Sequence, residues 1–188
     1  VQDASGESYE SYVARRIFEP FGMRHTTGEF WRGESMGRTQ GYRETTDGKP
    51  VPRLPSTSRE WTGSGMITST SADIGRYLRA LLAGGKAADG TQVLSEPGVA
   101  ELLRPQYAGE SELGGPTMYA LGWETTELNG VPVIMKAGSV ITMGSLFVML
   151  PKQRVGFALM FNLPDYGKVQ LVRNLMLYLV GEPTAPYQ

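Results

Sequence analysis

The amino-acid sequence predicts an α+β fold, in which a helical and loop region, residues 1–118, is followed by an antiparallel sheet with a carboxy-terminal helix, residues 119–188. Three observations support this fold class. Helical periodicity is concentrated before residue 105, short runs of β-type residues begin at residue 119, and one amphipathic segment lies near the end of the chain. Helices that precede a sheet are typical of α+β proteins, whereas a doubly wound fold alternates strands and helices.

The first helix is expected over residues 8–18. Ser8 is a suitable amino-terminal cap, and Pro20 and Gly22 end the helical pattern. Its apolar face consists of Tyr9, Tyr12, Val13 and Ile17. Residues 23–69 then show no sustained period and are rich in Gly, Ser, Thr, Pro and Arg, so they predict a long ordered loop region of the kind that lines binding sites.

A second helix is marked by a capping box, in which Thr70 and Asp73 stand three residues apart, and by the pair Gly84 and Gly85 at its end. Its apolar stripe consists of Ile74, Tyr77, Leu78, Leu81 and Leu82. A third, shorter helix is expected after Ser95, because Pro97 suits a first helical turn and Pro105 ends the pattern.

The second half predicts strands over residues 119–128, 131–136, 144–150 and 155–162, the last two joined by a turn at residues 151–154. The strand at 146–150 is apolar on both faces, which predicts cover on both sides of the sheet. A last helix, residues 168–180, has a broad apolar face suited to one of those sides.

Composition excludes several classes of function. The 18 Lys and Arg nearly cancel the 19 Asp and Glu and are scattered, so no nucleic-acid partner is expected. The chain has no cysteine, and its single histidine, His25, has no acidic residues at ligand spacing around it, so neither a metal site nor a cofactor is expected. His25 is interpreted as a surface residue.

Three stretches carry a resemblance to a known family. They are Ser8-Tyr-Glu-Ser-Tyr-Val-Ala-Arg-Arg-Ile-Phe-Glu-Pro-Phe-Gly-Met23 with the following Arg-His-Thr-Thr27, the segment from Gly63 to Leu82, and Tyr119-Ala-Leu-Gly-Trp123 with Lys136-Ala-Gly-Ser139 and residues 144–162. Over nearly its whole length the chain resembles the class C β-lactamase, D-peptidase and esterase branch of the serine β-lactamase and penicillin-binding-protein superfamily. The resemblance implies a β-lactamase-like (DD-peptidase) fold.

Such enzymes use a Ser-x-x-Lys nucleophile, a Tyr-x-Asn or Ser-x-Asn, and a Lys-Thr-Gly or His-x-Gly on a strand. None of the five lysines has a Ser three residues before it, and no Asn has a Tyr or Ser two residues before it. In the family both motifs precede the helix that starts here at Ser8. The 188 residues are therefore expected to be a carboxy-terminal part of a single domain, inactive without the missing amino-terminal segment.

The resemblance implies that Lys136 is the cation of the third motif, where it assists proton transfer and attracts a substrate carboxylate. It also implies that Gly138 admits the substrate backbone and that the Ser139 amide is an oxyanion-hole donor. Ala137, a substrate-binding candidate, replaces the usual Thr. Trp61 and Tyr42 are candidates for an aromatic wall of the substrate cleft. The alternative interpretations remain a solvent-facing strand lysine, a simple turn at 138–139, and aromatics that only pack.

The function implied is hydrolysis of a β-lactam, a D-amino-acid peptide or an ester through an acyl-enzyme. A small-molecule or peptidoglycan-like substrate and a periplasmic or extracellular location accompany this interpretation. The alternative is a non-catalytic binding or scaffolding module related to penicillin-binding proteins, favoured by the altered third motif. A third possibility is a stable unit that pairs with the missing segment, or with a second copy, through an open sheet edge.

Overall fold

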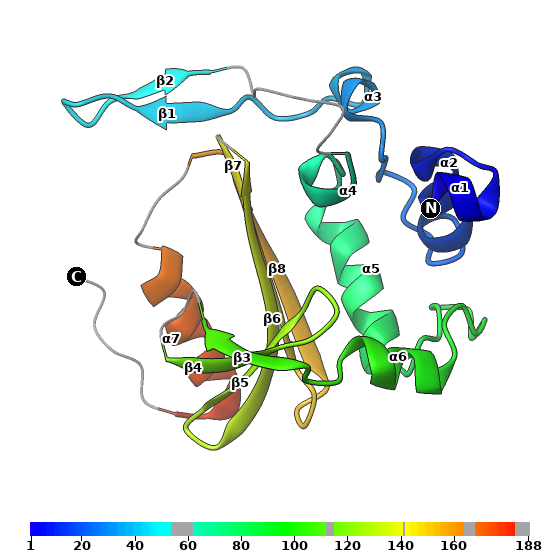
Figure 1. Cartoon of the computed structure of the whole chain (residues 1–188). Coiled ribbons are helices and arrows are strands. Elements are labelled where there is room, and N and C mark those ends of the chain that lie inside the picture. Colours follow the sequence, from blue (N-terminus) through cyan, green and yellow to red (C-terminus); the bar gives the residue numbers. More distant parts are fainter. Residues whose placement is uncertain (54–61, 112–114, 141, 164–167, 183–188) are drawn as a thin grey trace.

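The computed structural model describes residues 1–53, 62–111, 115–140, 142–163 and 168–182, and it has the predicted α+β order (Figure 1). The first half contains α1 (Gln2–Ser5), α2 (Tyr9–Val13), the π-helix η1 (Ala14–Phe18), α3 (Phe30–Ser35), β1 (Tyr42–Glu44), β2 (Pro50–Pro52), α4 (Thr62–Gly65), α5 (Ser71–Leu82) and α6 (Glu96–Leu102). The second half contains β3 (Tyr107–Glu110), β4 (Pro116–Tyr119), β5 (Glu124–Leu128), β6 (Val131–Val140), β7 (Met143–Leu150), β8 (Val155–Phe161) and α7 (Lys168–Val180).

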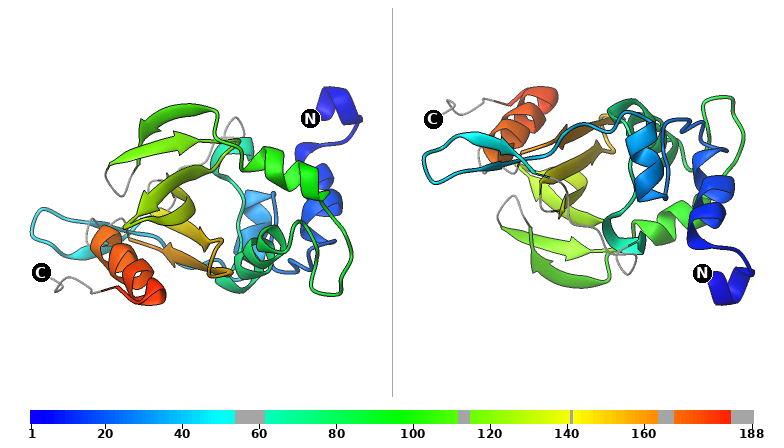
Figure 2. Two further views of the ribbon diagram at one scale, coloured as in Figure 1. Left: turned by 90° about the horizontal axis from the view of Figure 1, so that it is seen from below. Right: turned by 90° about the horizontal axis from the view of Figure 1, so that it is seen from above.

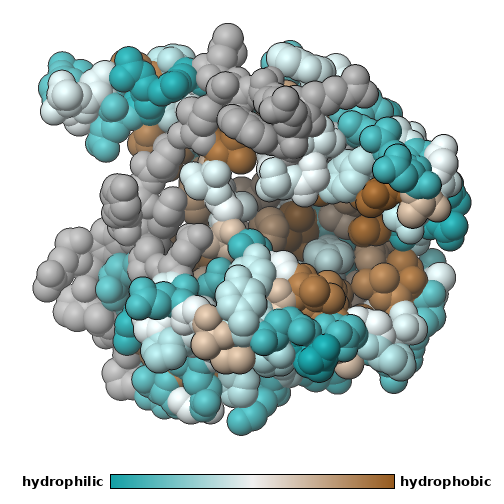
Figure 3. Space-filling model, viewed as in Figure 1, coloured by the Kyte–Doolittle hydropathy of each residue, from teal (hydrophilic) through white to brown (hydrophobic). Residues whose placement is uncertain are grey.

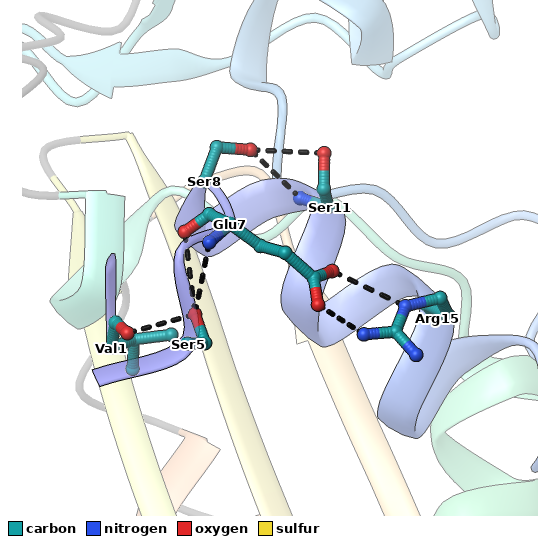
Figure 4. Close-up of polar contacts among 6 residues, drawn as sticks. All are labelled: Val1, Ser5, Glu7, Ser8, Ser11 and Arg15. Atoms are coloured by element: carbon teal, nitrogen blue, oxygen red, sulfur yellow. Dashed lines mark hydrogen bonds and ion pairs between the residues drawn. The ribbon is translucent and has the colours of Figure 1, made fainter. Parts of the chain in front are cut away.

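The helix predicted over residues 8–18 is confirmed, but its second half is π-helical. The Ser8 hydroxyl accepts a hydrogen bond from the Ser11 amide at 3.2 Å, and Arg15 pairs with Glu7 beside it (Figure 4). In an ordinary α-helix, residues five apart point to different sides, whereas the wider π turn brings Phe18 onto the buried side with Val13. Burial of both side chains is the physical reason for the change of pitch.

Helix α5 has the predicted cap and the predicted end. Thr70 Oγ1 accepts from the Asp73 amide at 3.2 Å, and the chain leaves the helix through Gly84 and Gly85, which have φ of 66° and 90°. The carboxylate of Asp73 binds elsewhere than a capping box predicts. It is fully buried and accepts from the His25 amide at 2.7 Å. Helix α6 is confirmed too, with the Ser95 hydroxyl as its cap.

The expectation of one long loop over residues 23–69 is wrong in part. The helix α3, the β1–β2 hairpin and the short helix α4 lie within it, and residues 54–61 are outside the described residues. Elements of three to six residues are shorter than the window in which periodicity can be recognised. The two ends of the region are joined by a bridge between Thr27 and Thr68, whose amides and carbonyls exchange two hydrogen bonds of 2.9 Å.

The main sheet is an antiparallel meander in the order β3-β4-β5-β6-β7-β8. Of the run expected as one strand over residues 119–128, residues 124–128 form β5, whereas Tyr119 is the last residue of β4. The chain turns back between these strands at Gly122, which has a φ of 85°. Strand β3 was not predicted, and all four of its residues are exposed. Strand β6 is longer than expected and continues to Val140.

Both faces of the sheet are covered, as predicted, and Figure 2 shows α7 on one side with α2, α5 and α6 on the other. Alternate residues of β7 serve the two cores. Met149 packs in a cluster with Leu78 and Leu81 of α5, whereas Val148 packs with Val172 and Met176 of α7. Within the described ranges, β8 has a strand partner on the β7 side only. None of the helices in those ranges is long and apolar enough to span a bilayer.

Candidate active site

Strand β6 carries the third-motif residues, and its two edges are paired to different extents. The pairing with β5 ends at Met135, opposite Glu124, while the pairing with β7 continues to Val140. Within the part of the chain that the structure describes, residues 136–140 therefore have a strand partner on one side only. Such a free edge presents backbone donors and acceptors to whatever lies beside it.

Lys136 is the first β6 residue beyond the β5 pairing. Because side chains alternate along a strand, it shares the face of Ile134, which packs against the core beneath α5. Its Nζ lies 3.3 Å from the Tyr119 hydroxyl and 5.1 Å from the centre of that ring. Its side chain is 37% exposed, so the ammonium is neither buried nor fully solvated.

Glu124 is a neighbour of this lysine that sequence reasoning missed. Its Oε1 lies 4.0 Å from the Lys136 Nζ, and its side chain is only 7% exposed. Its Oε2 is buried and has no hydrogen-bond partner among the described residues. A buried carboxylate oxygen without a donor is costly, so the nearby ammonium is the main group that offsets the charge of this side chain.

Gly138 and Ser139 lie on the same free segment and are both exposed. A side chain added at Gly138 would place its Cβ 3.3 Å from the Ser145 hydroxyl of β7, a tight contact. Opposite Ser139 stands Gly144, where an added Cβ would lie 2.0 Å from the Phe161 ring. Ala137 points to the other face and packs against the α7 core. Gly138 and Ser139 are therefore exposed on the free segment of β6, whereas Ala137 is packed beneath it.

The aromatic candidates are less closely tied to β6. The Tyr42 amide donates to the Asn162 carbonyl at 2.7 Å, which attaches β1 to the end of β8, two strands away from β6. Trp61 lies outside the described residues. The part of the same loop region that reaches β6 is α4, because an added Cβ at Gly65 would meet the Val140 side chain at 2.9 Å. His25 is exposed, as interpreted from the sequence.

Figure 3, which has the same view as Figure 1, shows a hollow in the surface with hydrophobic side chains at its floor. A separate shallow depression of about 390 Å³ lies between α5 and the β7–β8 turn, lined by Gly75, Arg79, Leu82, Ala83 and residues 154–156. It adjoins the opposite end of β7 from Gly144. The third-motif residues therefore do not line this depression.

A model of the beta-lactamase family matches residues 1–179. The chain belongs to the beta-lactamase family. The superfamily of serine β-lactamases and penicillin-binding proteins, predicted from the three sequence stretches, is thereby confirmed.

This beta-lactamase-family chain spans less than half the length of the relatives that follow. Penicillin-binding protein 4 of Amycolatopsis lactamdurans is 29% identical, over 86% of this chain and 43% of its own length. An unguisins hydrolase of Aspergillus violaceofuscus is 26% identical, over 97% of this chain and 36% of its own length. The octameric penicillin-binding protein homologue of Pyrococcus abyssi has the same fold, with a TM-score of 0.81, 21% identity and coverage of 96% of this chain and 40% of that one.

Proposed function

We propose that these residues are the carboxy-terminal part of an acyl-transfer serine hydrolase. The observation that carries the proposal is the free segment of β6, residues 136–140, where Lys136, Gly138 and Ser139 stand beside an unpaired strand edge. Membership of the beta-lactamase family supports a hydrolase of this type. The chain spans less than half the length of the relatives named above, so the nucleophile is proposed to come from residues outside these 188.

In the proposed reaction, an upstream Ser hydroxyl attacks the carbonyl carbon of a β-lactam, a D-amino-acid amide or an ester. The Ser proton passes to the leaving nitrogen or oxygen as its bond to the acyl group breaks. Lys136 supplies positive charge on the strand that faces the nucleophile and assists the proton transfer. The Ser139 amide donates to the developing oxyanion, and Gly138 leaves room for the substrate backbone.

Water then releases the acyl group and restores the Ser. One relative is named for binding penicillin and another for hydrolysing unguisins, and both names support acyl transfer as the chemistry. A peptidoglycan-like substrate and a location outside the cytoplasm remain part of the proposal. The hollow with an apolar floor supports the upstream segment as an intramolecular partner, because exposed apolar surface of this kind marks contact sites (Figure 3).

The test is an intact mass spectrum of the longest form of the protein that contains these residues, before and after incubation with a penicillin and with a fluorophosphonate. We expect a covalent adduct on one Ser outside these 188 residues. The 188 residues alone, which contain no Ser-x-x-Lys, should give neither an adduct nor ester hydrolysis. Hydrolysis by the 188 residues alone would contradict the proposal.

The non-catalytic binding module is the second candidate, and Ala137 in place of the usual Thr favours it. A longer protein that binds penicillin reversibly, without an adduct from either reagent, would establish that alternative. An adduct with the fluorophosphonate but not with the penicillin would restrict the substrate to esters or peptides. The two reagents therefore separate a silent module from an active enzyme of different specificity.

A further inference from the structure

The carboxylate of Glu124 is placed in an unusual way for a residue beside a catalytic cation. Its side chain is 7% exposed, its Oε2 has no partner among the described residues, and its Oε1 is 4.0 Å from the Lys136 Nζ. That separation is too long for a hydrogen bond and short enough for a strong charge interaction. Glu124 is thus held by its surroundings at a fixed distance from the ammonium.

Tyr119 completes this arrangement from the neighbouring strand. It stands directly opposite Glu124 in the β4–β5 pairing. Its hydroxyl oxygen accepts a hydrogen bond from the Lys136 Nζ at 3.3 Å, which uses one of the three donors of the ammonium. Lys136 is thus engaged by a carboxylate and a phenol that both come from the strands beside its free edge. Both groups draw the ammonium toward β4 and β5.

The charge balance has a consequence for substrates. A lysine with no acid beside it attracts an anion strongly, whereas a lysine 4.0 Å from a buried carboxylate attracts it less, because the carboxylate repels the same anion. Ala137, next to it, has no side-chain donor with which to bind a carboxylate. The pair of residues 136 and 137 is therefore poorly suited to an acidic substrate.

We infer that Glu124 and Tyr119 hold Lys136 and offset its charge, so that the site selects acyl donors without a carboxylate, in the manner of an esterase for neutral substrates. This inference rests on the proposed acyl-transfer function and specifies its substrate class. Glu124 and Tyr119 are positioning residues in this scheme, since they act on the substrate through Lys136. The inference reverses the attraction of a substrate carboxylate that the family resemblance implies for this lysine.

The experiment uses the longest form of the protein and two esters with the same leaving group, 4-nitrophenyl butyrate and the 4-nitrophenyl half-ester of glutaric acid, which carries one additional terminal carboxylate. The native protein should have the higher kcat/KM with the butyrate. Glu124→Gln, which removes the charge and keeps the size, should raise kcat/KM for the half-ester roughly tenfold, mainly through KM, because the repulsion between the Glu124 carboxylate and the substrate carboxylate is lost. The quantity compared is the ratio of kcat/KM for the half-ester to kcat/KM for the butyrate, because a change in the position of Lys136 alone alters both esters alike.

Glu127→Gln is the matched control, because Glu127 is an exposed glutamate of the same strand. It should leave both esters unchanged. Glu124→Asp, which keeps the charge, should retain the preference for the butyrate and so separates charge from packing. A native protein that prefers the half-ester would overturn the inference without any variant, and this measurement decides the matter if Glu124→Gln does not fold.

The outcomes also separate the inference from the proposed function. If the native protein hydrolyses the butyrate and Glu124→Gln changes both esters alike, the inference fails and the serine hydrolase stands. If neither ester is hydrolysed and no fluorophosphonate adduct forms, the proposed function fails and the inference fails with it. A rise confined to the charged ester, absent from the Glu127 control, is the result that supports the inference.

Discussion

Replacing Asp73 by alanine should destabilise the protein strongly. Its side chain is fully buried, and one carboxylate oxygen accepts from the His25 amide at 2.7 Å and from the Thr26 hydroxyl at 2.9 Å. The other oxygen pairs with Arg76, whose side chain is 44% exposed. These bonds join the loop after η1 to the first turn of α5.

The magnitude follows from those partners. A hydrogen bond to a charged group contributes about 1.5–3 kcal/mol, and Asp73→Ala removes two while leaving the His25 amide without its acceptor. The pair with Arg76 adds little because that side chain is largely solvated. We therefore expect a loss of about 3–4 kcal/mol in the free energy of unfolding. Asp73→Asn keeps the volume and one acceptor oxygen, so it should lose about half as much.

Urea unfolding at neutral pH, followed by tryptophan fluorescence, measures this loss. Asp89→Ala is the matched control, since Asp89 is exposed and accepts from Thr91, two residues away in the same turn, and its unfolding midpoint should stay close to that of the native protein. A loss below about 1 kcal/mol for Asp73→Ala would refute the reasoning. It would mean that water replaces the carboxylate at this site without cost.

Three further predictions concern Gly144 of the sheet, the half-buried Tyr77 and Lys136 of the candidate site. Gly144→Ala would bring a Cβ within 2.0 Å of the Phe161 ring, so unfolding should be easier by about 2–3 kcal/mol, and adding Phe161→Ala should recover part of it. Burial raises the pKa of Tyr77 in the folded protein, so the tyrosine of the unfolded chain ionises at lower pH. The free energy of unfolding should therefore fall as the pH rises above about 10. Urea titrations at pH 7 and 10.5 should show a smaller fall for Tyr77→Phe. Lys136→Ala should lower kcat/KM of the longer protein for 4-nitrophenyl butyrate by about 100-fold. It should also lower the unfolding midpoint, because the buried Glu124 carboxylate loses the ammonium that offsets its charge. An unchanged rate would remove Lys136 from the mechanism.

Local signals made most of the helices and the core strands predictable. Ser8, Thr70 and Ser95 cap their helices as expected because a cap depends on residues three positions away in the chain. The elements that were missed depend on tertiary context. Strand β3 is exposed along its whole length, so its residues carry no alternation of apolar and polar positions, and it forms only because β4 lies beside it.

Asp73 illustrates a correct local pattern with a different tertiary use. The sequence predicts a capping box, and the Thr70 half of it forms. The carboxylate binds instead to residues 25 and 26, which lie 48 and 47 positions away and cannot be identified from local spacing. The same limit applies to the candidate site. The Lys136 motif could be recognised from the residues around it in the sequence. Glu124 belongs to no sequence motif, and its place beside Lys136 depends on the pairing of β5 with β6.

The position of Glu124 can nevertheless be traced to a local signal. Asn129 and Gly130 have φ of 50° and 78°, the left-handed values of a two-residue hairpin turn, and Asn-Gly is the pair that favours this turn. Such a turn fixes the register of its strands, here with Leu128 opposite Val131, and the ladder then places Glu124 opposite Met135. Lys136 is the next residue, just beyond the end of this pairing, and its Nζ lies 4.0 Å from the Glu124 Oε1, although the two residues are twelve positions apart in the chain. Because a slip of one residue would reverse the faces of the strand, the charge of the candidate site depends on this turn as much as on its own motif.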